Sequence, residues 1–489
     1  MRSTAAWLGL AVLMGSFGFA ALARAQATPP AENEELEEEE ETEDLRQRLT
    51  EREDQRRPLR AWRTQVFGHL LTLGGEYGSE FDYLRRRVFE VDDDDQTIRP
   101  DRFGMEHALE VEAFYSLGEP LSFFAQVQGV LEKNIDPQQE SYDGYLQVEE
   151  LWIASEDIAG SDFSLDAGRL DFEDDRRWWW DDEVDAVRLG WEPAEAVEIS
   201  LAVGQQLLSD RSDHPYVEPD KEDVLRLLGE ASWGWRRDHV LALFGAYAND
   251  RSPSQLGDEV ADERVDDKDA VLGWVGIRAM GVFRLGENGL LGYWIDTALV
   301  RGREEDVVTR FEPGQEPTEE NRRRDVSGTA FDIGVNWILP FDLAPRLFAG
   351  YARGSREFQQ TGLQANEAGF GGVERFPSYG LLLAPELANI SVVTVGVGLS
   401  LLHSSSLDLV YHSYRRVDPG RGLSSDTLDA TLDDQHHNLG NGIDLVLALE
   451  EWERLEFTFA LAALRAGPAF VESPDTWSYG GFAAIRYAF

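Results

Sequence analysis

The 489-residue chain contains no cysteine, which excludes disulfide bridges, thiolate metal sites, thiol nucleophiles and a lipoprotein anchor. This absence suits an exported protein, because free thiols can mispair in an oxidising compartment. Basic residues are also scarce: 45 lysines and arginines stand against 92 acidic residues, for a net charge of −47. So negative a chain would be repelled by a phosphate backbone, and we expect no nucleic acid among its partners.

Long hydrophobic runs are also scarce in the sequence. The apolar stretch from Ala5 to Leu22 follows Arg2 and precedes a small-x-small cleavage signature, so residues 1–25 are predicted to be a secretory signal peptide rather than a membrane anchor. Residues 26–60 are strongly acidic and predict a disordered segment, either a solvated tail or an interaction arm. No later segment carries about 18 consecutive apolar residues, so hydrophobic helices cannot carry residues 61–489 across a membrane.

What the chain does have is alternation with a period of two residues. Residues 393–399 and 455–461 place apolar side chains at every second position. The intervening positions are rich in Gly, Ala and Ser with scattered Asp, Glu and Arg, whereas a soluble sheet would show mostly charged residues or Thr there. One apolar face and one polar face of this kind are typical of strands in a transmembrane barrel, the spanning structure that remains when helices are excluded.

About eighteen such segments of roughly ten residues follow one another. They begin near Val66, Arg102, Leu121, Tyr145, Asp162, Val184, Val197, Val224, Val240, Val271, Leu290, Gly328, Arg346, Val392, Leu407, Ile443, Leu455 and Trp477. Short turns alternate with longer polar loops, including residues 132–143, 208–222, 249–269, 302–327, 355–389 and 417–440. We therefore predict an all-β fold: a transmembrane antiparallel β-barrel in the bacterial outer membrane, with short periplasmic turns and long extracellular loops.

Strand phase predicts which charged residues face the lumen. If the apolar side chains point outward, the inward set contains Arg188, Arg226, Arg278, Arg416 and Arg486, with His412 beside them. The same rule sends inward Glu110, Glu112, Glu198, Glu230, Asp296, Asp332, Asp408, Asp444 and Glu456. The arginines could form an attractive path for carboxylates, or they could pair with the acids and make the barrel rigid.

Three stretches resemble a known family. They are residues 168–189, which include Gly168-Arg169 and a cluster of three tryptophans, the strand 408–415 around His412, and residues 439–447. Together they resemble the alginate-export porins of the bacterial outer membrane. The resemblance implies an eighteen-stranded barrel with an arginine-lined lumen that passes an anionic uronate polymer outward by diffusion. It also adds Arg169 and Arg465 to the candidate pore residues, although their phase puts both outward or at the rim.

Two features depart from that family. Its alginate porin has a long periplasmic loop near the C-terminal end that covers the pore, but the matching turn here is only residues 450–454. The net charge of −47 is also unusual for a conduit of polyanions, although much of the acid lies in the predicted tail and loops, where it could bind divalent cations together with lipopolysaccharide.

Catalytic and metal motifs are weak. The chain has no G-x-S-x-G elbow and its eight histidines mostly occur singly, so we expect neither an enzyme nor a cofactor. The adjacent His436 and His437 point apart in an extended chain, which favours a solvated loop over a metal site. The cluster Trp178, Trp179 and Trp180 could stack on sugar rings or form an aromatic girdle at the outer interface.

The sequence therefore predicts an outer-membrane diffusion channel that exports an anionic, alginate-like polysaccharide. Two alternatives stay open: a general or solute-specific uptake porin, and a barrel that serves as a surface-binding adhesin. Expected partners are the polysaccharide, outer-membrane lipid with lipopolysaccharide, and periplasmic export proteins.

Overall fold

The computed structural model describes residues 62–91, 98–99, 101–118, 121–136, 140–194, 196–214, 216–218, 221–251, 268–310, 318–421, 423, 430–471 and 474–489. The predicted signal peptide, residues 1–25, and the predicted acidic segment, residues 26–60, lie outside the described residues. Within the described ranges, no helix has the length and apolar character needed to cross a membrane.

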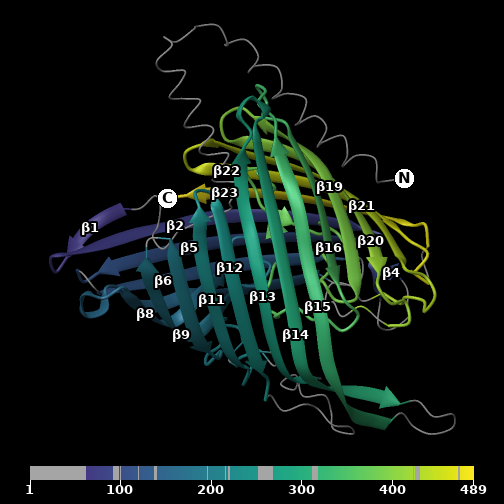
Figure 1. The fold of residues 1–489 in the computed structure, drawn as a ribbon, viewed down its shortest axis with the longest axis horizontal. Coiled ribbons are helices and arrows are strands. Elements are labelled where there is room, and N and C mark those ends of the chain that lie inside the picture. Colours follow the sequence, from purple (N-terminus) through teal and green to yellow (C-terminus); the bar gives the residue numbers. More distant parts are fainter. Residues whose placement is uncertain are drawn as a thin grey trace. The chain divides into compact units, whose positions relative to one another are not determined.

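Eighteen antiparallel strands form a closed barrel (Figure 1). Each pairs with its neighbour along the chain, and β2 pairs with both β5 and the last strand, β23, which closes the sheet. The strands are β2 (His69–Arg85), β5 (Arg102–Ser116), β6 (Leu121–Ile135), β7 (Glu140–Ser155), β8 (Phe163–Glu173), β9 (Asp181–Ala194), β10 (Val197–Gly204), β11 (Leu225–Arg236), β12 (His239–Asn249), β13 (Lys268–Arg284), β14 (Leu290–Arg310), β15 (Thr318–Ile338), β16 (Arg346–Gly354), β19 (Ile390–Leu401), β20 (Ser405–Arg416), β21 (Asn438–Trp452), β22 (Leu455–Ala466) and β23 (Trp477–Ala488).

The remaining elements are short. β1 (Trp62–Val66) pairs with the first residues of β2, and β3 (Arg87–Val91) pairs with β4 (Ile98–Arg99). β17 (Glu367–Ala368) and β18 (Phe376–Pro377) form a small hairpin within the connection between β16 and β19. Two 3-10 turns, η1 (Ile158–Gly160) and η2 (Gly286–Asn288), lie in short turns between strands.

The two faces of the barrel follow from the alternating sequence. In β20, Val410, His412 and Tyr414 are at most 1% exposed, whereas the intervening Leu409 and Tyr411 are 46% and 40% exposed. Alternation of this kind places apolar side chains on the outward surface, where lipid would cover them, and places polar and small side chains inward. Part of the inward face is covered because two loops fold back against it.

The eighteen-strand barrel predicted from the alternation is confirmed. Most strands begin close to the predicted residue, but β7 begins at Glu140 rather than near Tyr145, and β15 at Thr318 rather than near Gly328. Two predicted loops are wrong. In place of a loop over residues 132–143, β6 continues to Ile135 and β7 begins at Glu140. In place of a loop over residues 302–327, β14 continues to Arg310 and β15 begins at Thr318. Between β14 and β15 the strand pairing continues beyond the apolar region, where it is accompanied by cross-strand ion pairs. Arg324 lies 2.9 Å from Glu304, and Arg303 lies 3.6 Å from Asp325. Charged strands of this kind look like a loop when only hydrophobic alternation is read.

Candidate functional site

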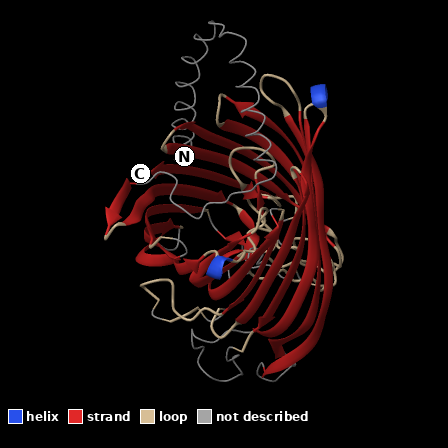
Figure 2. Cartoon of the chain, turned by 60° about the vertical axis from the view of Figure 1, so that its left-hand side comes forward, coloured by secondary structure: helices blue, strands red, loops and turns tan. Residues whose placement is uncertain are grey.

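Two connections between strands fold into the lumen (Figure 2). The first, the β8–β9 loop, comprises residues 174–180. The second, the β16–β19 loop, comprises residues 355–389. Their apolar side chains are covered: Trp179 is 1% exposed, Phe370 4% and Leu383 0%. Phe370 stacks on Phe348, an inward side chain of β16, with ring centroids 4.6 Å apart. The two loops therefore give the barrel an interior core.

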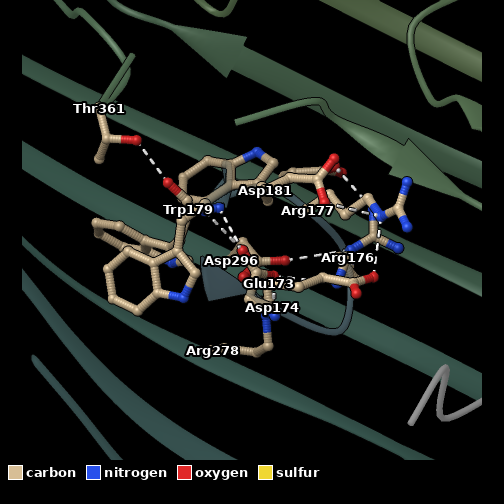
Figure 3. A network of polar contacts seen from close by, with 12 residues as sticks. Glu173, Asp174, Arg176, Arg177, Trp179, Asp181, Arg278, Asp296 and Thr361 are labelled. Atoms are coloured by element: carbon tan, nitrogen blue, oxygen red, sulfur yellow. Dashed lines mark hydrogen bonds and ion pairs between the residues drawn. The ribbon is translucent and has the colours of Figure 1, made fainter. Parts of the chain in front are cut away.

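A chain of buried ion pairs holds the β8–β9 loop against the wall (Figure 3). Asp174 pairs with Arg278 of β13, whose Nε also donates to Asp296 of β14 at 2.6 Å. Arg176 lies 3.3 Å from Asp296 and 3.1 Å from Asp332 of β15. All five side chains are at most 5% exposed. Water therefore screens these pairs little, and loss of one partner would leave a buried charge.

The same network binds the β16–β19 loop. The Tyr379 hydroxyl donates to Asp332 at 2.9 Å and accepts from Trp178 Nε1 at 3.0 Å. Burial and the nearby Asp332 charge raise the pKa of Tyr379 well above its ordinary value, so the phenol stays a neutral donor. The two loops are thus joined to each other as well as to the wall.

Asp174 remains ionised within this core. Burial alone would raise the pKa of its carboxyl, but the Arg278 guanidinium and the backbone N–H groups of Trp180, Arg176 and Trp179 hold that pKa below its usual range. One carboxylate therefore both caps the turn of its own loop and pairs with the barrel wall.

A second anchor fixes the β16–β19 loop on the neighbouring strands. The Leu381 N–H donates to Asp444 of β21 at 3.1 Å, and the Thr394 hydroxyl of β19 donates to the Ser378 carbonyl at 3.3 Å. His412 lies between them, with Nε2 3.2 Å from Asp444 and Nδ1 3.1 Å from Thr394 Oγ1. His412 is 0% exposed, so the side chain predicted beside the arginine path is enclosed by this anchor.

Glycines on the inward face make room for the loops. A Cβ on Gly276 of β13 would lie 2.3 Å from the Trp179 ring, and one on Gly328 of β15 would lie 2.3 Å from Phe358 Cα. No side chain fits at such distances. Small residues on the inward face are therefore a sequence signal of loop packing.

An open space of about 1100 Å³ remains beside the β16–β19 loop. Its wall is the inward face of β2, β5, β6, β7, β21, β22 and β23. Four guanidinium groups and ten carboxylates line it. The lining charged residues are Arg102, Arg177, Arg375 and Arg486, with Glu76, Glu80, Asp82, Glu110, Glu112, Glu150, Glu367, Glu374, Glu450 and Glu456.

The five predicted arginines all lie on the inward phase, but four of them are away from this space. Arg278 belongs to the buried network, and Arg416, 3% exposed, donates to backbone carbonyls of the connection after β20. Arg188 lies 2.9 Å from Asp166 of β8. Arg226 shares the inward phase of β11 with buried Leu228 and is not among the residues that line the space.

Arg486 alone of the five lines the open space. It lies 3.6 Å from Glu80, 3.8 Å from Glu374 and 4.0 Å from Glu76, and its side chain is 37% exposed. These long, partly exposed pairs contrast with the short, buried pairs of Arg278.

Arg169 has a structural place in the wall. β7 and β8 pair over only five residues, and beyond them the Val148 N–H donates to the Asp210 carbonyl at 2.9 Å, so the β10–β11 connection continues the sheet. Arg169 fills the junction: it is 2.9 Å from Asp185 and donates to the carbonyls of Val148 at 3.2 Å and Leu208 at 2.7 Å. Arg169 lies on the outward phase of β8, and its guanidinium links β7, β9 and the β10–β11 connection in the barrel wall.

Arg465 lies on the outward phase near the end of β22. It is 3.0 Å from Asp475, and both side chains are more than half exposed. Neither of the two arginines suggested by the family resemblance lines the open space.

The tryptophan cluster departs from both expectations. Trp178, Trp179 and Trp180 are at most 4% exposed, and Trp179 stacks on Phe244 of β12 with ring centroids 5.1 Å apart. Protein covers these rings, so they are closed to a sugar, and they lie inside the barrel rather than in an interfacial girdle. The rings are enclosed because the β8–β9 loop folds into the lumen.

Strand phase, as read from the sequence, did not predict three of the four arginines that line the open space. Arg102 opens β5 and lies 3.5 Å from Asp82 of β2. Arg177 and Arg375 belong to the two inward loops, where strand phase has no meaning. Arg177 is 2.7 Å from Glu367, so it also joins one loop to the other. The signal that could have found it is its position beside the buried tryptophans.

The histidine pair belongs to a loop without metal geometry. His436 Nδ1 contacts Asp433, whereas His437 Nδ1 lies 2.9 Å from the Arg416 carbonyl oxygen. Hydrogen bonds from the His436 side chain and backbone lower the pKa of Asp433 to about 2. In the described part of the chain, no group of three or more His, Asp or Glu side chains is arranged to hold a metal ion.

The turn between β21 and β22 is short, since β21 ends at Trp452 and β22 begins at Leu455. A long periplasmic loop therefore does not occupy the lumen at this position. The inward loops enter from the opposite end of the barrel, the end that carries the long connections.

Comparison with known proteins agrees with the fold and the sequence resemblance. A family model described as alginate export matches residues 80–479. The alginate production protein AlgE of Pseudomonas aeruginosa is 26% identical over 316 residues, which cover 62% of this chain and 63% of that protein. The protein of the same name from Pseudomonas syringae pv. tomato is 24% identical over 327 residues, covering 63% and 66%.

The chain therefore spans somewhat less than two thirds of the length of these curated relatives. Among solved structures, Pseudomonas aeruginosa OccD3 (OpdP) superposes with a TM-score of 0.51 at 10% identity, covering 88% of this chain and 95% of that one. At that identity the likeness concerns the barrel fold.

Proposed function

The chain belongs to the alginate-export family, and from this premise we propose that it is a diffusion channel that exports an anionic polysaccharide such as alginate. The barrel fold and the family place the protein in the outer membrane. The observation that carries the proposal is the open, charged space beside two loops that are fixed to the wall. An extended polymer can pass such a space while the loops stay in place.

The arginines of the open space suit a sliding polyanion. Arg102 and Arg486 contact their carboxylates at 3.5 to 4.0 Å with side chains 37–39% exposed, so these pairs are weak. A uronate carboxylate can replace a protein carboxylate at such a guanidinium and leave again, because the exchange conserves the number of ion pairs. Repeated exchange of this kind moves a chain without trapping it.

The same proposal covers the partners. Lipid contacts the apolar outward face, lipopolysaccharide meets the acidic outer loops through divalent cations, and periplasmic export proteins deliver the polymer at the end with short turns. Diffusion requires no covalent step, so the proposed function includes no catalysis.

Block of single channels by oligouronates tests the proposal. Purified protein in a planar bilayer should show current interruptions when oligouronates are added, and neutral maltooligosaccharides of equal length should cause fewer. Secretion of uronate polymer by cells whose own exporter is replaced by this protein is the second measurement. Equal block by charged and neutral oligomers, together with no secretion, would show that the channel carries another solute.

A further inference from the structure

The open space has the wrong balance of charge for a simple anion pore. Ten carboxylates and four guanidinium groups line it, and among the residues that the structure describes no other basic side chain belongs to its lining. In a confined space with low-dielectric walls, the few lining charges set the potential that a small ion meets.

The four guanidinium groups are already engaged. Arg177 contacts Glu173, Asp181 and Glu367 at 2.7 to 3.2 Å, and Arg375 contacts Glu173 as well. Arg102 and Arg486 have the longer pairs described above. Each positive charge is therefore offset by at least one carboxylate, and the excess at the open space is negative.

Part of this excess of negative charge comes from the register of two neighbouring strands. Glu76 of β2 lies directly opposite Glu110 of β5, and Glu112 follows on the same face of β5. Like charges directly opposite each other destabilise a strand pair. Arg486, 4.0 Å from Glu76, offsets only part of this repulsion because that pair is long and partly exposed, so mobile cations beside Glu110 and Glu112 would relieve the rest. A path that offers such a gain admits cations ahead of chloride.

We propose that the open path is cation-selective when empty, and that a polyuronate crosses it accompanied by cations that screen its carboxylates from Glu110 and Glu112. The first part stands on the lining alone. The second part rests on the proposed function. Together they assign the two signs of charge different tasks: exposed arginines hold the polymer transiently, and the acids keep it mobile and supply its counter-ions.

Reversal potentials under a steep KCl gradient test the first part. The parent channel should prefer K⁺ over Cl⁻ by about threefold or more, and Glu110→Gln with Glu112→Gln should bring the ratio toward unity. A matched control is Glu287→Gln with Asp342→Asn, which removes the same charge from exposed short turns and should keep the parent's preference. Heat-modifiable migration in detergent confirms that each variant is folded.

Oligouronate block at low and high Ca²⁺ tests the second part. Added Ca²⁺ should lengthen or multiply blocking events in the parent, and this effect should shrink in the Glu110→Gln, Glu112→Gln variant. A chloride preference in the parent, or an unchanged K⁺ preference in the double variant, overturns the inference even if oligouronates still block. Cation preference without any oligouronate block would instead leave the selectivity assignment intact and remove the export function.

Discussion

The two sides of the lumen contain the same kinds of charged residue, but the charges are buried in short ion pairs on one side and partly exposed in long ion pairs on the other. Along β13, β14 and β15, inward Arg and Asp side chains lie under the loops, at most 5% exposed and in contact at 2.6 to 3.3 Å. Along β2 and β23, inward Arg and Glu side chains are 37–39% exposed and 3.6 to 4.0 Å apart. An inward charge is therefore held in a fixed ion pair where a loop covers it, and it is accessible to a solute where water reaches it.

Removing Asp174 should have the largest effect, because it breaks the covered side. In Asp174→Ala three backbone N–H groups lose their acceptor, and the Arg278 guanidinium keeps only Asp296 as its partner. A buried N–H group without an acceptor costs about 1–3 kcal/mol, so the loss of the acceptor for three of them should detach the β8–β9 loop. Urea titration followed by tryptophan fluorescence should show an earlier transition, and single-channel conductance should rise.

Asp174→Asn is the control for charge, since it keeps the shape and an acceptor oxygen and should fall between parent and alanine variant. If Asp174→Ala has the parent's conductance and urea midpoint, the loops are held by apolar packing alone.

Arg169 tests a third environment, the wall itself. Arg169→Gln should destabilise the barrel by about 1.5–3 kcal/mol, because the buried guanidinium makes charge-assisted hydrogen bonds to Asp185 and two carbonyls. Ion selectivity and oligouronate block should stay those of the parent, because the side chain is outside the open space. A changed selectivity with unchanged thermal stability would place Arg169 in the conduction path.

Substitution of arginines that line the open space should have a smaller effect, and it should act on oligouronate binding. Arg102→Gln with Arg486→Gln should weaken oligouronate block by about fivefold, since exposed ion pairs are worth about 0.2–1 kcal/mol each. The measurement is the concentration of oligouronate that halves the current. A block as strong as the parent's would show that the polymer takes another route through the barrel.

Arg465→Gln should have the smallest effect and serves as the matched control for loss of one exposed arginine. Its pair with Asp475 is more than half exposed on both sides, so the expected cost is about 0–1 kcal/mol with unchanged block. A clear loss of block in this variant would mean that the outer rim captures the polymer before it enters the lumen.

Strand positions and strand phase could be predicted because alternation is local. The apolar periodicity of β19 and β22 appears within seven or so residues, and one phase rule sends Arg278 and Arg486 to the same face. What happens to them there depends on distant segments. Arg176 meets Asp332 156 positions away, and Trp178 meets Tyr379 201 positions away.

Such distant contacts leave only faint traces in the chain. Gly276 and Gly328 are small because a loop packs on them, yet glycine is common on any inward barrel face. This is why sequence phase placed Arg278 inward but could not distinguish an attractive path from a structural pair. Replacing Arg278 by Glu would set a third carboxylate beside Asp174 and Asp296, so misfolding is expected there in place of reversed selectivity.

The hairpin of β14 and β15 reaches much farther than a bilayer requires (Figure 1). Each strand has 21 residues, or about 70 Å of extended chain, whereas the apolar band of such barrels is about 25 Å tall. Even with strong tilt, its charged outer part stands clear of the lipid and within reach of large molecules in the surroundings. On an intact cell this hairpin is therefore the natural target for antibodies and proteases, and a place where an epitope can be displayed without touching the lumen.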